Sequence, residues 1–144
     1  MFLAFDSCFD PRTVAILMRV LPDTYEVMQE MAPWVKRWPR FIECMDDETI
    51  LDGRRRGAGH GQYSPDEKRI WINPYMSSYG VWLNLIHENM HHAFPDATEI
   101  EINNLLTPYV ASEVLGHPID LDQARLHGLG PAVKGIPGRG YAGT

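Results

Sequence analysis

The chain has 144 residues, of which 44% are hydrophobic and 22% charged, and its formal net charge is −6. This composition is typical of one globular domain and excludes a wholly disordered protein. The negative charge disfavours the broad basic surface that nucleic-acid binding requires, and no stretch approaches the roughly 18 uninterrupted apolar residues of a membrane span.

The cysteines, Cys8 and Cys44, form no CxxC pair and indicate neither a disulfide framework nor a cysteine zinc site. We expect both to be small core residues, because no histidine lies near either in the sequence to activate a nucleophile. The N-terminus lacks the basic region of a signal peptide, and Asp6 interrupts its apolar run. These features predict a reducing, cytoplasmic compartment.

The N-terminal part is predicted to hold two helices and one strand. Asp10 and Pro11 begin a helix that Pro22 should end. Apolar residues at helical spacing predict a second helix over 24–38, kinked at a proline, and a short apolar run predicts a strand over 40–45. Residues 52–61 include four glycines and are predicted to form a loop.

The central part predicts a hairpin followed by a long helix. An extended pair at 62–63, a Ser-Pro-Asp turn at 64–66 and a strand over 69–73 make up the hairpin. Isoleucines alternate with Arg69 and Trp71 in the second strand, which suits a strand buried on one side. Ser77 or Ser78 should cap the long helix, which Phe94-Pro95 should end.

Two further helices are predicted near the C-terminus. Thr98 and Glu101 form a capping box that begins the first, and Pro108 should kink it. A short helix over 121–127 should end at Gly128. The sequence therefore predicts an α+β domain over 1–130, with a small hairpin preceding the long helix, and a glycine- and proline-rich tail over 131–144.

The long helix carries the motif His87-Glu88-Asn89-Met90-His91, which is HExxH. Residues four apart on a helix lie about 40° from each other, so both imidazoles can approach one metal ion. Glu88 falls beside the ion, where it can take a proton from a water that the metal activates. The apolar residues of this helix form a stripe that marks its buried face. The histidines lie at the border of that face, and Glu88 lies further round the helix, toward solvent.

Two histidines leave a catalytic zinc site one protein ligand short. Phe94-Pro95 turns the chain back toward the motif, and the acidic residues that follow are Asp96, Glu99 and Glu101. Glu101 is committed to the capping box and Asp96 to a turn. Glu99 is therefore our choice of third ligand, with Glu101 and Asp96 as the alternatives.

The segments RIWINP, LIHENMHH and AFPDATEIEI together resemble the small zincin-like metallopeptidase domains of bacteria and phages. In those domains a strand precedes an HExxH helix, and a glutamate that opens the next helix completes a zinc site. The likeness covers about residues 61–106. It implies a zincin-like fold and a zinc-dependent peptide-bond hydrolase, with His87, His91 and Glu99 as Zn²⁺ ligands and Glu88 as general base. It also implies that the strand over 69–73 borders the cleft, where an extended peptide could add as a further strand.

Two features of the expected site stay open at this point. His92 follows the motif directly and lies four residues from Glu88, so it could orient Glu88, but we favour a side chain in solvent. Hydrolysis also needs a group that stabilises negative charge on the carbonyl oxygen. Residue type alone suggests five candidates, which are Tyr63, Tyr75, Tyr109, His60 and His117.

The main hypothesis is therefore a zinc hydrolase that acts on a peptide or protein, with no nucleic-acid or membrane partner. In one rival hypothesis the protein binds zinc but catalyses no reaction, and the ion only stabilises a binding or regulatory module. A second rival has no metal and is a structural or interaction protein. Metal binding and hydrolysis separate the three hypotheses.

Overall fold

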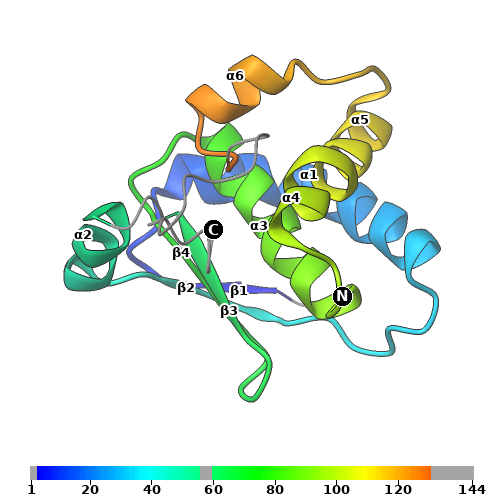
Figure 1. Cartoon of the computed structure of the whole chain (residues 1–144). Helices are drawn as coiled ribbons and strands as arrows, with labels where there is room; N and C mark the ends of the chain where they lie inside the picture. The colour runs from blue at the N-terminus through cyan, green and yellow to red at the C-terminus, as the bar shows by residue number, and fades with distance from the viewer. Residues whose placement is uncertain (1–2, 56–59, 131–144) are drawn as a thin grey trace.

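The computed structural model of the chain describes residues 3–55 and 60–130. These residues form an α+β fold in which helices accompany a small four-stranded sheet (Figure 1). The elements in chain order are β1 (Ala4–Phe5), α1 (Pro11–Met31), β2 (Phe41–Cys44), α2 (Asp47–Arg55), β3 (Gly61–Ser64), β4 (Arg69–Ile72), α3 (Ser78–Ala93), α4 (Glu99–Glu101), the π-helical turn η1 (Ile102–Leu106), α5 (Thr107–Leu115) and α6 (Leu121–Leu126). The predicted tail over 131–144 lies outside the described residues.

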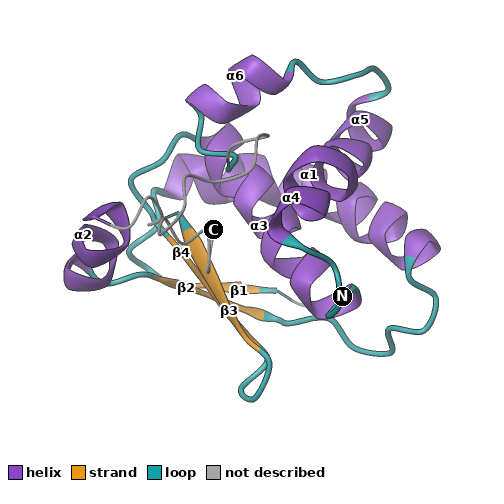
Figure 2. Ribbon diagram, in the orientation of Figure 1, coloured by secondary structure: helices purple, strands orange, loops and turns teal. Residues whose placement is uncertain are grey.

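The sheet has the strand order β1-β2-β4-β3. β1, β2 and β4 run parallel, and β3 pairs antiparallel with β4, which confirms the predicted hairpin. Ile70 and Ile72 are fully buried on the face that the helices cover, while Trp71 points to the other face. Figure 2 shows α1, α3 and α5 gathered on one side of the sheet, with α2 apart at one end of it.

α1 runs unbroken through the proline that was expected to end it, so the prediction of two helices was wrong. Pro22 lies inside the helix, which ends at Met31 instead of continuing to residue 38. An internal proline costs roughly 3 kcal/mol. Burial of apolar side chains on both sides of it, including Leu17, Leu21 and Met28, offsets that cost.

α2 corrects the predicted loop over 52–61, because the first part of that range is helical. The side chain of Asp46 accepts a hydrogen bond from the backbone N–H of Thr49 at 2.7 Å, and two acidic residues occupy the first turn. Both features favour a helix N-terminus and lie before the glycines on which the loop prediction rested. Residues 56–59 of the predicted loop lie outside the described part of the chain.

α3 is the central helix of the fold, and it begins and ends as the sequence predicts. The Ser77 hydroxyl caps its N-terminus, and it ends at Ala93. Twelve of its sixteen residues are buried, and it contacts β3, β4, α1 and α5. Polar contacts tie it to α1, because the Trp82 indole donates to Thr24 at 3.0 Å and the Asn89 amide donates to Tyr25 at 3.3 Å.

The capping box of Thr98 and Glu101 is present as predicted, but the helix that it begins is not regular. The chain widens into a π turn over 102–106 just before Pro108, in place of a simple proline kink. The extra residue in this turn shifts the side-chain register. Ile102 and Val110 are therefore buried, whereas Leu105 and Tyr109 are exposed.

Cys8 and Cys44 form a disulfide. This corrects the prediction that the cysteines are unpaired and the prediction that both are small core residues. Cys8 is exposed and Cys44 is half-buried, so neither is a small core residue. They meet because β1 pairs in parallel with β2, which brings the end of each strand to the same edge of the sheet. Sequence spacing could not show this pairing, because the cysteines are 36 positions apart and the whole of α1 lies between them. No helix of the described residues meets the length and apolar character that a membrane crossing requires.

Loss of the disulfide should lower the free energy of unfolding by about 2–4 kcal/mol, because it closes a long loop and so restricts the unfolded chain. The measurement is urea unfolding of the oxidised protein with and without reductant. The matched control is a variant with Cys8→Ser and Cys44→Ser, whose unfolding midpoint should not respond to reductant. An equal midpoint for the oxidised protein and this double variant would contradict the prediction.

Candidate metal centre

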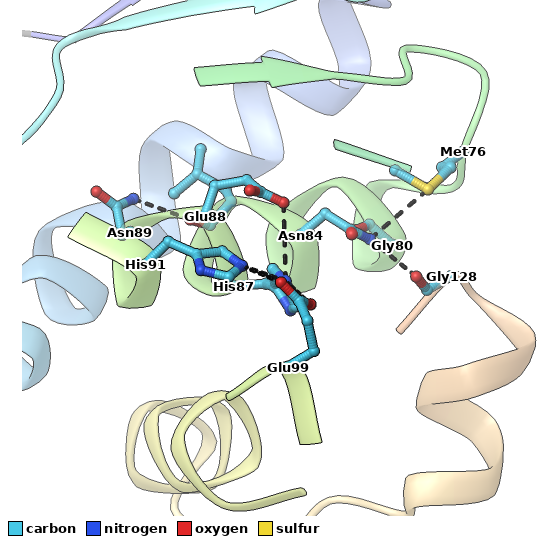
Figure 3. A network of polar contacts seen from close by, with 10 residues as sticks. Met76, Gly80, Asn84, His87, Glu88, Asn89, His91, Glu99 and Gly128 are labelled. Carbon is cyan, nitrogen blue, oxygen red and sulfur yellow. Dashed lines mark hydrogen bonds and ion pairs between the residues drawn. The ribbon is translucent and has the colours of Figure 1, made fainter. Parts of the chain in front are cut away.

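Three of the predicted ligands converge at one point between α3 and α4. Nε2 of His87 and Nε2 of His91 lie 3.1 Å apart. The carboxylate of Glu99 meets both rings, with one oxygen 3.1 Å from His87 and the other 2.6 Å from His91. Figure 3 shows the two imidazoles and this carboxylate directed at one another from different elements. The turn at Phe94-Pro95 is what brings the start of α4 back to α3.

The structure separates Glu99 from the two alternative third ligands. The side chain of Glu101 accepts a hydrogen bond from the backbone of Thr98 at 3.0 Å, which holds it in the capping box and lowers the pKa of its carboxyl. Asp96 is exposed in the turn before α4. Among these three carboxylates, Glu99 alone contacts the histidines in the described structure.

Glu88 lies beside this cluster and not toward solvent, which corrects the expectation from the apolar stripe. Its side chain has no exposed surface, and one of its oxygens lies 3.9 Å from Nε2 of His87. α3 is covered by the sheet as well as by helices. The side of the helix that was expected to face solvent is therefore also buried. Burial raises the pKa of the Glu88 carboxyl well above its usual range, and the charge of Glu99 adds to the effect.

The donor set fits a divalent cation. Two imidazole nitrogens and a carboxylate are the ligands of a hydrolytic zinc site. Both oxygens of Glu88 are buried and have no hydrogen-bond partner among the described residues. An uncompensated buried carboxylate costs several kcal/mol, and a nearby cation would remove much of that cost.

His87 is held in the neutral form that a metal ligand needs. Burial lowers its pKa well below the ordinary value, and the neighbouring charges of His91 and then His60 lower it further. A neutral imidazole offers a lone pair to a metal. His60, which precedes β3 and was expected in a loop, therefore lies close enough to the centre to act on it electrostatically.

Asn103 is a functional candidate that the sequence reasoning missed. Nδ1 of His87 and Oδ1 of Asn103 are buried without a well-formed hydrogen bond, yet Asn103 lies close enough to raise the pKa of His87. A Cβ at Gly130 would collide with the Asn103 amide, so glycine there leaves room for it. The signal was available, because Asn103 follows Glu99 by four residues and so lies about one helical turn further along.

The strand that borders the centre is β3, which corrects the assignment of this role to residues 69–73. β4 lies between β2 and β3, whereas β3 forms the edge of the sheet. Gly61 of β3 approaches the site so closely that a Cβ there would lie 3.0 Å from an oxygen of Glu88. Glycine at this position therefore lets the edge strand pass over the carboxylate.

A cleft of about 340 Å³ opens beside the centre. Its walls come from β3, the hairpin turn, α3 and the turn before α4. They are formed by Tyr63, Pro65, Glu88, His91, His92, Pro95 and Glu99. Glu88 and two of the three converging residues thus face one cavity, which a substrate could enter.

His92 neither orients Glu88 nor stands free in solvent. It is half-buried, with Nδ1 2.6 Å from the Tyr63 hydroxyl and Nε2 2.7 Å from the carbonyl oxygen of Arg37. Burial lowers the pKa of the His92 ring, which favours its neutral form. The predicted solvent-exposed side chain was therefore wrong.

Of the five candidates for stabilising a carbonyl oxygen, Tyr63 is the one that lines this cleft. Tyr75 donates its hydroxyl to Asp47 at 2.8 Å, Tyr109 is half-exposed on α5, and His117 contacts the carbonyl of Pro118. None of these three is among the cleft residues. Comparison with known proteins returns no match to a family model, a curated protein or a solved structure.

Glu99→Gln should weaken zinc binding by more than about 100-fold, because a neutral amide replaces the carboxylate that meets both histidines; even outer contacts to a metal ligand are worth 10–100-fold. Glu101→Gln is the matched control, two residues away in the same helix, and should leave zinc affinity unchanged. Competition with a chromogenic chelator measures both. Equal affinities of the two variants would contradict the assignment of Glu99.

Asn103→Leu should weaken zinc binding by about 10–100-fold while retaining one zinc per chain, because it removes the amide that faces His87 but leaves the converging residues intact. The same chelator competition measures the affinity. A matched control is Asn104→Leu at the next position, where the asparagine amide contacts Arg125. If both variants bind zinc like the wild type, Asn103 does not support the centre.

Proposed function

We propose that this protein is a zinc-dependent hydrolase of peptide bonds with a zincin-like site. The observation that carries the proposal is the burial of Glu88, which lines a cleft beside two histidines and a glutamate and whose oxygens have no hydrogen-bond partner among the described residues. A purely structural metal site needs the converging ligands but not a second, buried carboxylate beside a cleft.

His87, His91 and Glu99 would hold the ion. A zinc ion held there supplies Lewis acidity, which activates water and polarises a substrate carbonyl. A side chain must be deprotonated before it binds a metal ion. The neutral state of His87 suits this role, and so does the contact of each Glu99 oxygen with one histidine.

Glu88 serves as general base and then as general acid. Its oxygen lies 3.9 Å from Nε2 of His87, beside the ligands, where it accepts a proton from the attacking water. It then carries that proton to the leaving amine. Its raised pKa makes the protonated form accessible for this second step, because burial favours the neutral carboxyl.

An extended peptide is the substrate that the edge of the sheet accommodates. β3 is the edge strand and runs directly above Glu88, so a peptide paired with β3 would bring a carbonyl group to the centre. Main-chain pairing recognises the backbone, and the apolar walls of the cleft at Pro65 and Pro95 would contact side chains.

The disulfide bears on where this chemistry takes place. A stable link between Cys8 and Cys44 favours an oxidising environment over the cytoplasm expected from the sequence. We therefore place the proposed hydrolase outside the reducing cytoplasm.

Glu88→Gln should lower hydrolysis by at least about 100-fold and leave one zinc bound per chain, because the amide cannot accept the proton and Glu88 is not among the converging ligands. The assay is zinc-dependent cleavage of denatured casein, with new termini located by mass spectrometry. Glu113→Gln, at an exposed position of α5, is the control and should cleave like the wild type.

The results also separate the rival hypotheses. Zinc bound at one per chain without cleavage by the wild type would favour a zinc-stabilised module. Failure to bind zinc at all would favour a metal-free protein. Full activity of Glu88→Gln would contradict the proposed mechanism.

A further inference from the structure

Tyr63 and His92 form a pair on the wall of the cleft that the proposed mechanism does not use. Tyr63 projects from the edge strand β3, and His92 lies near the end of α3. Their Oη and Nδ1 atoms are 2.6 Å apart. The Trp38 ring packs against His92 with centroids 5.8 Å apart, which holds the imidazole from another side.

The second nitrogen of His92 decides the direction of this hydrogen bond. Nε2 lies 2.7 Å from the backbone carbonyl of Arg37, and a carbonyl oxygen can only accept. Nε2 therefore carries a ring hydrogen, and an imidazole with one ring hydrogen then presents Nδ1 as an acceptor. The hydroxyl of Tyr63 must then donate its single hydrogen to His92, so it has none to donate into the cleft.

Besides Tyr63, the side chains that line the cleft offer little to a polar backbone. Glu88, His91 and Glu99 belong to the centre, Pro65 and Pro95 have no polar side-chain atom, and both nitrogens of His92 are engaged. Among the lining side chains, the lone pairs of the Tyr63 oxygen are thus the hydrogen-bonding capacity that neither the centre nor His92 takes up. They can accept an N–H group but cannot stabilise an oxyanion without breaking the contact to His92.

We propose that Tyr63 accepts a hydrogen bond from a backbone N–H of the peptide substrate, and that His92 is the positioning residue that orients the Tyr63 hydroxyl. This inference rests on the proposed peptide-bond hydrolysis and assigns a role in recognising the substrate. It also reverses the role that residue type alone suggested for Tyr63, which was donation to the carbonyl oxygen.

The test compares the wild type with Tyr63→Phe on one peptide taken from a mapped casein cleavage site. A set of analogues carries a single N-methyl group at each backbone nitrogen in turn. Tyr63→Phe should raise KM for the unmodified peptide by about three- to tenfold with kcat little changed, because one neutral hydrogen bond common to ground and transition states is lost. N-methylation of the one nitrogen that Tyr63 contacts should raise KM of the wild type by a similar factor. The same N-methylation should not raise KM of Tyr63→Phe any further.

Controls separate positioning from a general loss of structure. Tyr79→Phe removes a tyrosine hydroxyl outside the cleft residues and should match the wild type on every analogue. His92→Phe should behave like Tyr63→Phe, whereas His92→Asn should recover part of the lost affinity, because the asparagine oxygen can accept the Tyr63 hydroxyl near the place of Nδ1. Zinc content is measured for each His92 variant, since His91 is its neighbour.

Two results would overturn the inference while leaving the proposed function standing. In one, N-methylation at every position raises KM by the same factor in Tyr63→Phe as in the wild type. No substrate N–H then depends on Tyr63. In the other, Tyr63→Phe lowers kcat at constant KM for all peptides, as a donor to the oxyanion would. A wild type without zinc-dependent cleavage would instead overturn the proposed function, and this inference with it.

Discussion

The burial of α3 on nearly all sides is the constraint on which the rest of the structure depends. Polar and charged groups on a buried helix must find partners, because each unpartnered group costs free energy comparable to a lost hydrogen bond. Thr24 and Tyr25 of α1 supply partners for Trp82 and Asn89. The start of α4 supplies a partner for the histidines, through Glu99. The neighbouring elements are thus arranged around the polar residues of one helix.

The same constraint bears on the candidate metal ligands and Glu88, which lie near the C-terminal end of this helix. The buried atoms of α3 without a hydrogen-bond partner among the described residues are both carboxylate oxygens of Glu88, Nδ1 of His87 and Oδ1 of Asn89. Glu88 lines a cleft, and Gly61 lets the edge strand pass close to its carboxylate. The candidate site therefore combines a low-dielectric environment, which strengthens electrostatic interactions, with a cleft beside the edge of the sheet.

Local signals in the sequence were reliable where local chemistry decides the outcome. The Ser77 cap, the Thr98–Glu101 capping box and the hairpin turn involve residues a few positions apart, so their hydrogen bonds form much the same in any fold. The predictions failed where packing outweighed local preference. Pro22 stays inside α1 because the apolar residues around it are buried, and the π turn before Pro108 changes which side chains face the core.

The sequence by itself determined that His87 and His91 share a helix face and that a carboxylate follows within reach, because helix periodicity and a proline turn are local properties. Only the tertiary structure decided which carboxylate meets them, that Glu88 is buried, that β3 is the edge strand, and that Cys8 meets Cys44. These outcomes depend on strand order and on what covers α3 from the other side. Such contacts join segments far apart in the chain, and the spacing of residues along it carries no record of them.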